Sequence, residues 1–443
     1  MKYFLTIFLL FSPFLGFSQF KLTPEQDSIR KELARLSKLD HQDMLEQLNI
    51  QNLRPGRSGN QDGPNPANYD ETKANPFPDY PPILVRNNGD TIKNSHDWWY
   101  LRRPEIVDAF NEEVYGNVPE IMPKVNWVLL KQESVLLGKT SARLRTYQGQ
   151  VDNSKYPDIS VNIDLQVFLP MKIDKEIPLI MEFIFLWPEG FKMPPSPYTP
   201  WEEQVVSRGW AAAKIVPTSF QADNGAGLRS GIIGLVNKGE PRKPNDWGAL
   251  RAWAWGASKA MDLFKEMPEI NEFRVGIAGH SRFGKAAAVT MAFDSRFYAA
   301  YISSSGEGGL KPHRRDFGET VENLTGSGEY HWMAGNFIKY GGPKNWNDIP
   351  VDAHSLLALI APRRVFISIG TDGGDKWTDP HGMYLAALKA EPAYKILWHK
   401  GLGIIKEPAV GELVDIGRIA FRYHEKGHIT GPNWPYFLDF FEK

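Results

Sequence analysis

The stretch from Arg274 to Val289, RVGIAGHSRFGKAAAV, has a serine where an apolar run passes into a segment of small residues. A serine on a sharp strand-to-helix turn can act as a nucleophile, and such turns usually read G-x-S-x-G. Ser281 follows Gly279, but the second glycine, Gly284, comes one residue late, with Phe283 in its expected place. On spacing alone, Ser281 is either a nucleophile or part of an ordinary connection between a strand and a helix.

A serine nucleophile needs a histidine that takes its proton, and in an α/β-hydrolase this histidine comes last along the chain. His428 follows Gly427 on a turn-prone stretch, before the final segment from Trp434 to Phe441. His428 is therefore the candidate base, and the alternative is an ordinary surface histidine in a loop.

The same stretch contains the pattern H-E-x-x-H, formed by His424, Glu425 and His428, which binds zinc when it lies on a helix. Gly427 disfavours a helix at this point, and the preceding run from Ile416 to Tyr423 is more typical of a strand. We therefore predict no metal and no other cofactor.

An acid that orients the histidine is expected on the loop after the penultimate strand. Asp372, Asp375 and Asp379 all follow the apolar run from Arg364 to Ile369. Capping a turn is the ordinary role of each aspartate, and at least two of the three must have it.

The elements that hold these candidates are indicated by short, nearly continuous apolar runs that alternate with helical stretches. This pattern predicts an α/β fold, a mostly parallel sheet sandwiched by helices. Active sites of such sheets form at the carboxyl ends of the strands, and Ser281 follows such an end. Helices are predicted from His96 to Gly116 and from Trp247 to Met267. Strands are predicted at Lys124 to Gln132, Ser141 to Tyr147, Asp158 to Phe168, Ile177 to Phe185, Trp210 to Val216, Arg274 to Ala278, Tyr298 to Ser304, Arg364 to Gly370 and Tyr394 to Trp398.

The N-terminal segment, MKYFLTIFLLFSPFLGFS, has the composition of a signal peptide: a lysine, an apolar stretch too short to span a membrane comfortably, and small residues at its end. We expect residues 1–18 to be this signal peptide, and the mature protein to be periplasmic or secreted without a membrane anchor. Residues 19–82 are predicted to form an N-terminal helix, capped by Thr23, and an extended arm rich in Pro, Gly and Asn. Residues 83–443 are predicted to form the catalytic domain.

Charge and cysteine content exclude several function classes. A net charge of −1 over 443 residues argues against nucleic acid or an anionic membrane as the main partner, because both need a basic face. The chain contains no cysteine, which excludes disulfides, thiolate catalysis and cysteine-ligated metals. We expect a monomer. The sequence leaves open whether the polar, Gly-rich segment from Thr218 to Lys243 shapes a cleft.

Several long motifs in a fixed order resemble the glucuronoyl esterases, carbohydrate esterase family 15. The serine turn matches that family's signature G-[CH]-S-R-x-G-K, which includes the displaced glycine. The resemblance implies an α/β-hydrolase fold with an N-terminal extension, and an esterase that cleaves the ester between (4-O-methyl-)glucuronate of glucuronoxylan and lignin alcohols. The matching segments cover most of the chain and include NYDETKANPFP, RRPEIVDAFNEEVYGNVP, PNDWGALRAWAWGASKAMDLF, ENLTG, HWMAGNFIKY, DAHSLLALIAPRRV, DKWTDPHG and YHEKGHITGPNWPYFLDF.

The resemblance also implies roles for single residues. Ser281 would form an acyl-enzyme, and His428 would take its proton. Arg282, directly after the serine, would help stabilise the oxyanion. Lys285, about one helical turn further on, would bind hydroxyl groups of the uronate. The remaining substrate-binding positions are Trp377 over the sugar ring, and Glu329 and Trp332 in the sequence GEYHW. Core packing is the alternative role of both tryptophans.

One departure from the family pattern concerns the acid. Many members carry it at the start of an E-S-G-x-G-G motif, and the corresponding residue of this chain is Ser304. Some other bacterial members similarly place the acid after the penultimate strand. We therefore predict Asp375 as the acid, with Asp379 and Glu307 as alternatives and a site without an acid as the remaining possibility.

Two rival functions remain compatible with the sequence. The first is a broader carboxylic-ester hydrolase acting on acetyl or aryl esters, because esterase folds change substrates through their loops. The second is a non-catalytic protein that binds acidic xylan, although such a protein would be expected to lack the nucleophile or the base.

Overall fold

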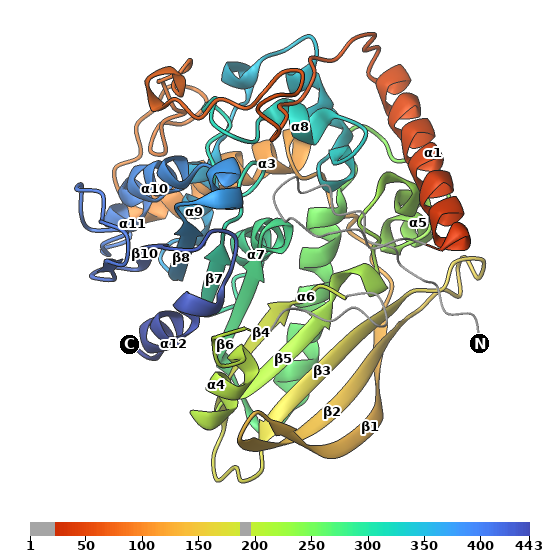
Figure 1. Ribbon diagram of the computed structural model, residues 1–443, viewed down its shortest axis with the longest axis vertical. Helices are drawn as coiled ribbons and strands as arrows, with labels where there is room; N and C mark the ends of the chain where they lie inside the picture. Colours follow the sequence, from red (N-terminus) through yellow and green to blue (C-terminus); the bar gives the residue numbers. More distant parts are fainter. Residues whose placement is uncertain (1–22, 187–195) are drawn as a thin grey trace.

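The computed structural model describes residues 23–186 and 196–443 (Figure 1). The predicted signal peptide, residues 1–18, lies outside the described residues. Helix α1 (Pro24–Gln47) begins after Thr23, as expected. The Thr23 hydroxyl accepts a hydrogen bond from the backbone N–H of Gln26 at 3.2 Å, and the Gln26 side chain accepts one from the backbone N–H of Thr23 at 3.0 Å. These two bonds satisfy donors that a helix start leaves free.

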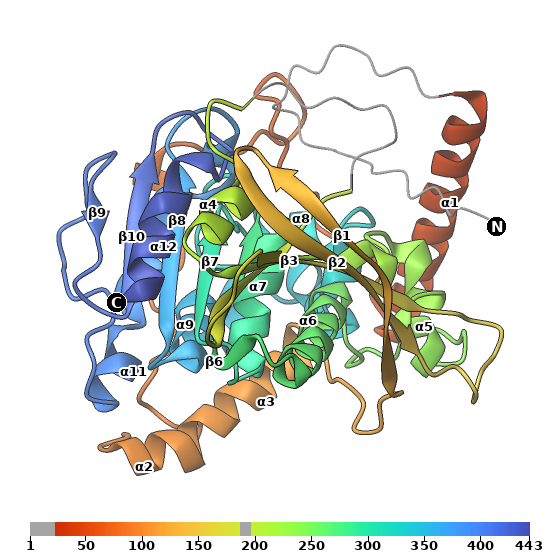
Figure 2. The same ribbon diagram turned by 90° about the horizontal axis from the view of Figure 1, so that it is seen from below.

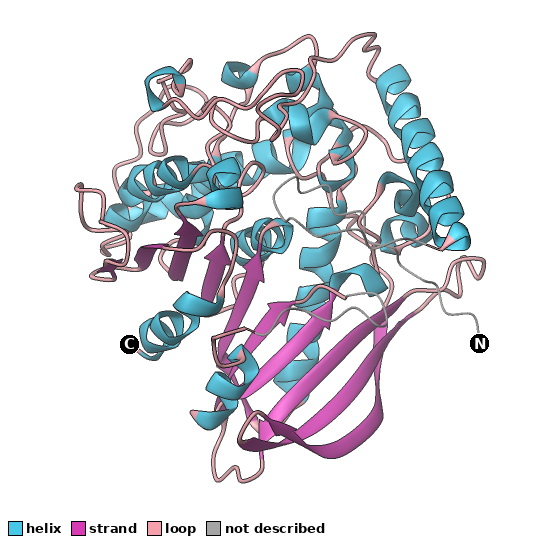
Figure 3. Cartoon of the chain, in the orientation of Figure 1, coloured by secondary structure: helices cyan, strands magenta, loops and turns pink. Residues whose placement is uncertain are grey.

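A ten-stranded sheet forms the centre of the molecule, drawn in magenta in Figure 3. Its strand order is β1-β2-β3-β5-β4-β6-β7-β8-β10-β9. The run from β5 to β10 is parallel, whereas β1 to β3 at one edge and β9 at the other pair antiparallel. The strands are β1 (Val125–Leu137), β2 (Thr140–Val151), β3 (Asn162–Pro170), β4 (Ile177–Phe183), β5 (Ala211–Val216), β6 (Ile270–His280), β7 (Ala299–Ser303), β8 (Arg364–Gly370), β9 (Leu413–Val414) and β10 (Ile419–His424).

Helices cover both faces of this sheet. Figure 2 shows α6 (Ala249–Glu266), α7 (Arg282–Phe293) and α9 (Ala353–Ile360) on one face, and α4 (Trp201–Ser207) and α12 (Trp434–Glu442) on the other. The remaining helices are α2 (Ser95–Asp97), α3 (Arg103–Glu113), α5 (Ile232–Val236), α8 (Val321–Thr325), α10 (Pro380–Lys389) and α11 (Glu391–Ile396), and a π-helical turn, Trp98–Arg102, joins α2 to α3. The predicted mostly parallel sheet sandwiched by helices is confirmed.

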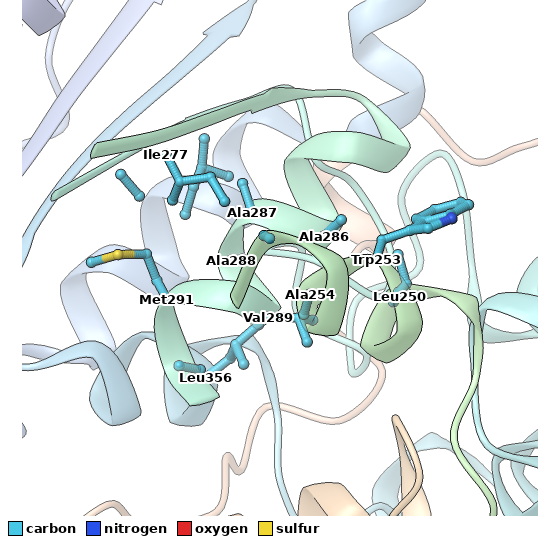
Figure 4. Close-up of a cluster of buried hydrophobic side chains, with 14 of the residues drawn as sticks. Leu250, Trp253, Ala254, Ile277, Ala286, Ala287, Ala288, Val289, Met291 and Leu356 are labelled. Atoms are coloured by element: carbon cyan, nitrogen blue, oxygen red, sulfur yellow. The ribbon is translucent and has the colours of Figure 1, made fainter. Parts of the chain in front are cut away.

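The packing of α6 on α7 explains the small residues after Ser281. Figure 4 shows Ala286, Ala287 and Ala288 of α7 between the strand residue Ile277 and the α6 side chains around Trp253. All three alanines are fully buried. Small side chains allow α7 to approach both the sheet and α6, which fixes the start of α7 beside the carboxyl end of β6.

One predicted strand, Tyr394 to Trp398, was wrong. Residues Glu391–Ile396 instead form helix α11, which has a proline in its first turn. The buried residues Ala393, Tyr394 and Leu397 are spaced at helical intervals, so their burial follows the period of a helix. A short apolar run is compatible with either element, and the run alone does not distinguish them.

The N-terminal arm lies along the domain surface and bonds to it closely (Figure 1). The Arg54 guanidinium donates to the carbonyl of Gly342 at 2.6 Å and to the Glu322 carboxylate at 2.9 Å. Arg57 pairs with Asp316 at 2.6 Å. In α1, the His41 ring bonds to the carbonyl of Thr325 at 2.9 Å. Among the described residues, no helix is long and apolar enough to cross a bilayer.

Candidate active site

Ser281 lies on a strained turn between β6 and α7. Its backbone has φ 57° and ψ −129°, a conformation that non-glycine residues rarely adopt. The turn is held by a hydrogen bond from the Ser281 N–H to the carbonyl of Ser303 at 2.9 Å. A Cβ atom on Gly279 would lie 2.0 Å from the carbonyl oxygen of Phe283, so only glycine fits before the turn. These features are those of a nucleophile elbow, where strain positions the serine side chain at the end of the strand.

The late glycine of this turn has a packing reason. A Cβ atom on Gly284 would lie 2.7 Å from the carbonyl oxygen of Ser303, so α7 passes close to the end of β7 at this residue. Phe283, in the position usually taken by glycine, is fully buried. Its ring lies 4.4 Å from that of Phe185 and 5.2 Å from that of Trp253, measured between centroids. The side chain of Phe283 therefore packs in the core, and the close approach to the carbonyl of Ser303 occurs at Gly284.

His428 comes from the loop after β10 and contacts Asp375, which follows β8. The His428 Nδ1 atom forms a short hydrogen bond with Asp375 Oδ1. Asp375 is fully buried, whereas 29% of the His428 side chain is exposed. The ring of His428 lies 4.2 Å from the ring of His280, the residue directly before Ser281. The structure therefore brings together the elements that carry the predicted nucleophile, base and acid.

Both carboxylate oxygens of Asp375 are fixed. Oδ2 accepts hydrogen bonds from the Ser304 hydroxyl at 2.9 Å and from the backbone N–H of Gly370 at 2.6 Å. Burial by itself would raise the pKa of Asp375, but its hydrogen bond to His428 and the nearby ring charges outweigh burial, and the pKa lies below its usual value. Asp375 is thus an ionised acceptor that can hold one nitrogen of His428 as a donor.

The two alternative acids lie in other contacts. Asp379 pairs with Arg315 at 2.7 Å and caps helix α10 through the N–H of Gly382 at 2.9 Å. Glu307 pairs with Lys311 at 2.8 Å and forms a short hydrogen bond with His313. Since neither contacts His428, Asp375 is the one of the three predicted acids that does.

Arg282 forms an ion pair with Asp223, a residue that was not among the candidates predicted from the sequence. Its guanidinium lies 2.6 Å from Asp223, whose other oxygen bonds to the His331 ring at 2.9 Å and to the Trp332 indole N–H at 2.6 Å. Burial opposes ionisation of Asp223, but the charge of Arg282 and these bonds hold the pKa of Asp223 well below its usual value. Asp223 therefore fixes both Arg282 and Trp332. It comes from the segment Thr218 to Lys243 that could have formed a cleft wall.

Lys285 is buried on α7 in a charged pair with Glu319. Its Nζ lies 3.1 Å from Glu319 Oε2 and 5.4 Å from the centroid of the Trp332 ring. The Glu319 carboxylate also accepts from the N–H of Glu307 at 3.0 Å. The Glu319 N–H donates in turn to the carbonyl of Trp377 at 2.8 Å. Glu319, which sequence reasoning missed, therefore links Lys285 to the loop that carries Trp377 and Asp375.

Glu329 lies near the same charges. Loss of solvent, and then repulsion from Glu319, raise the pKa of Glu329 to about 8, although Lys285 and Arg282 act in the opposite direction. A neutral carboxyl group can donate as well as accept a hydrogen bond at pH 7. The predicted residues Arg282, Lys285, Glu329 and Trp332 thus form one polar cluster. Two further acidic residues of this cluster, Asp223 and Glu319, come from sequence-distant loops.

The H-E-x-x-H segment has no helical geometry. His424 is the last residue of β10. Its ring nitrogens are engaged by the carbonyl of Gly427 at 2.9 Å and by the side-chain amide of Asn433 at 3.0 Å. Within residues 23–186 and 196–443, no group of three or more acidic or histidine side chains is arranged to hold a metal ion.

Known proteins resemble the chain over nearly its whole length. A family model of fungal glucuronyl esterases matches residues 242–398. A glucuronoyl esterase of carbohydrate esterase family 15 from Teredinibacter turnerae is 45% identical, with a TM-score of 0.87 and coverage of 92% of this chain and 99% of that one. A glucuronoyl esterase from Solibacter usitatus is 32% identical, with a TM-score of 0.74 and coverage of 84% and 99%. A family 15 esterase from a marine bacterial metagenome, described as promiscuous, is 28% identical, with a TM-score of 0.73 and coverage of 85% and 99%.

The sheet, and the order Ser281, Asp375, His428 along the chain, define an α/β-hydrolase with the layout of a serine esterase. The Teredinibacter turnerae enzyme shares this fold and 45% of its residues across almost the full length of both chains. The chain belongs to carbohydrate esterase family 15, the glucuronoyl esterases, and it is an esterase.

Proposed function

We propose that the chain hydrolyses the ester between (4-O-methyl-)glucuronate of glucuronoxylan and alcohols of lignin, through an acyl-enzyme on Ser281. The contact between His428 and Asp375, next to the strained turn of Ser281, is the observation that carries this proposal. Family membership supports the glucuronate ester as the bond that is cleaved.

The reaction has two halves. His428 takes the proton of the Ser281 hydroxyl, and the serine oxygen attacks the carbonyl carbon of the ester. The carbon–oxygen bond to the alcohol then breaks, and His428 gives its proton to the leaving alcohol. Water, activated by His428, attacks the acyl-enzyme and releases glucuronate. Asp375 stays ionised throughout and stabilises the positive charge that His428 carries between the two transfers.

In this proposal, Arg282 stabilises the negative charge that develops on the carbonyl oxygen of the ester. The backbone N–H after the nucleophile is the usual donor to an oxyanion, and the guanidinium would add a full positive charge. The ion pair with Asp223 supports this role, because it holds the side chain of Arg282 in one place before the substrate arrives.

The sugar is bound by Lys285, Glu329, Trp332 and Trp377 in this proposal. The buried pair of Lys285 with Glu319 supports it, because a rigid charged pair presents donors and acceptors to hydroxyl groups at fixed positions. Trp377 is partly exposed and is thus available to stack on a sugar ring, whereas Trp332 is 3% exposed and acts mainly as a wall below Lys285.

The test replaces Ser281 by Ala and compares hydrolysis of benzyl glucuronate with binding of acidic xylo-oligosaccharides. Hydrolysis should fall to background while binding persists. Hydrolysis that continues in the variant would show that Ser281 is not the nucleophile. A chelator should leave the rate unchanged.

A broader carboxylic-ester hydrolase is the second candidate, since the relative from the marine metagenome is described as promiscuous. Lys285→Met separates the two candidates, because it keeps the length of the side chain and removes its charge. Turnover of benzyl glucuronate should fall by roughly 10- to 100-fold while turnover of an aryl acetate changes little. An equal loss on both substrates would remove the sugar-binding role of Lys285.

We further propose residues 1–18 as a cleaved signal peptide, residues 19–82 as the N-terminal helix and arm, and residues 83–443 as the catalytic domain of a periplasmic or secreted monomer. N-terminal sequencing of the exported protein tests the cleavage site. Sedimentation of the mature protein tests its oligomeric state.

A further inference from the structure

A cleft lies at the opposite end of the sheet from Ser281. It has a volume of about 370 Å³, and its walls include Arg364 at the start of β8, Arg418 just before β10, and Trp398 and Lys400 after α11. The parallel strand β8 (Arg364–Gly370) separates this cleft from the loop of Asp375. At about 3.3 Å per residue, the two ends of that strand are roughly 20 Å apart, so the cleft is no extension of the active site.

Trp398 is exposed to solvent and has an unusual backbone conformation. Its side chain is 89% exposed, and its φ of 63° is in the left-handed region that residues other than glycine rarely adopt. An exposed tryptophan in a strained backbone contributes little to the core, and strain of this kind occurs at binding sites. Ile416, which is 58% exposed, lies on the wall of the same cleft and extends its apolar surface.

Positively charged side chains predominate in the walls of this cleft. Within the described ranges, Arg364, Lys400 and Arg418 form no salt bridge, whereas Lys443 on the same wall pairs with Asp415. Burial, together with the charge of Arg418, lowers the pKa of His399, which also lines this cleft. Because these three cations have no carboxylate partner among the described residues, the cleft favours an anionic ligand.

We propose that this cleft binds a uronate-bearing oligosaccharide, with a sugar ring stacked on Trp398 and its carboxylate held by Lys400 and Arg418. An aromatic face next to cations matches an acidic sugar, which has an apolar ring face and a carboxylate at its edge. The identity of the polymer as acidic xylan rests on the proposed function. The site would hold the enzyme on the polysaccharide at a distance from the reacting ester.

The experiment compares the full-length protein with Trp398→Ala and Lys400→Glu, using de-esterified glucuronoxylan as the probe and neutral arabinoxylan as its control. Each variant should weaken glucuronoxylan binding by roughly fivefold or more. Phe273→Ala, which removes an aromatic side chain that is 78% exposed elsewhere, should leave binding unchanged. In the wild type, the polymer should protect the backbone amides of residues 398–418 from hydrogen exchange.

Several outcomes would overturn the proposal. The first is unchanged glucuronoxylan binding in both variants. The second is neutral arabinoxylan that binds the wild type equally tightly and loses this binding in the same two variants. The third is self-association of the protein through Trp398 in the absence of sugar. Turnover of a small soluble glucuronate ester is measured on the same samples, and it should be unchanged in Trp398→Ala and Lys400→Glu. A wild type without that turnover would contradict the proposed function, and binding at the cleft would still be measured separately.

Discussion

Ser304 donates a hydrogen bond to Asp375 Oδ2 at 2.9 Å, and both side chains are fully buried. By the sequence resemblance, Ser304 corresponds to the first residue of the E-S-G-x-G-G motif, the position expected for the acid. Its backbone has a positive φ of 45°, and its N–H donates to the carbonyl of Ser368 at 2.9 Å, so the hydroxyl is held in place. The hydroxyl of Ser304 thus helps to fix Asp375, the acid of the proposed mechanism, which comes from the loop after the neighbouring strand β8.

Replacing Asp375 by Asn should lower kcat for a glucuronate ester by about 10²- to 10⁴-fold, with little change in KM. The reason is that the amide cannot stabilise a protonated His428, and the ring loses its fixed orientation. Asp372→Asn is the matched control, because Asp372 lies on the same loop, is exposed and forms no ion pair with any residue that the structure describes. Steady-state kinetics of both variants give the kcat and KM values that test this prediction. A loss of less than tenfold for Asp375→Asn would indicate a site that works without this acid.

The order of the catalytic elements could be predicted from the sequence, because each candidate follows a strand that the local pattern makes recognisable. Ser281, Asp375 and His428 each follow the carboxyl end of a strand, and parallel strands bring such ends to one edge of a sheet. Their partners could not be predicted in this way. Asp223 and Glu319 contact Arg282 and Lys285 across the fold, and nothing in the neighbouring sequence specifies that pairing.

A similar limit explains the wrong strand at Tyr394 to Trp398. Four to six apolar residues have the same composition in a buried strand as in a short helix, and the choice depends on which neighbours bury them. The proline in the first turn of α11 was the local signal for a helix.

Ser304→Ala should lower kcat by roughly three- to tenfold, since one hydrogen bond to a buried charged group is lost while the Gly370 N–H remains. Removing a donor to a carboxylate raises its pKa. A more basic carboxylate stabilises the charged form of its hydrogen-bonded partner more strongly, so the acidic limb of the kcat profile should shift to higher pH. The pH dependence of kcat measures this shift.

Ser305→Ala is the control for that prediction. The Ser305 hydroxyl accepts a hydrogen bond from the N–H of Leu310 at 3.0 Å and does not contact Asp375. Its pH profile should match that of the wild type. If Ser304→Ala also keeps the wild-type profile and rate, the hydrogen bond to Asp375 has no role in catalysis.

Asp223→Asn should reduce both stability and turnover. The pKa of Asp223 is depressed in the folded state by Arg282, despite burial, so this group stabilises the fold above its unfolded pKa of about 3.9 and loses that effect as the pH falls below it. Removing the charge should cost up to about 3 kcal/mol at pH 7, because Arg282 is left unpaired. The variant should also lose less stability than the wild type between about pH 5 and pH 2. Urea unfolding across this range tests the sign, and a parallel pH dependence in both proteins would refute it.

Gly284→Ala tests why the second glycine of the serine turn comes late. Alanine is the better helix former by about 1 kcal/mol, so a turn without a packing constraint would be stabilised. In this fold the new Cβ would lie 2.7 Å from the carbonyl oxygen of Ser303, so β7 or α7 must shift. We expect a net destabilisation of about 1–2 kcal/mol, a lower Tm and a loss of activity, since the Ser281 N–H donates to the same carbonyl. Gly326→Ala is the control, because its nearest contacts would be 3.6 Å away. Thermal unfolding of both variants gives the answer, and equal Tm values for Gly284→Ala and the wild type would show that the position of this glycine is not set by its approach to β7.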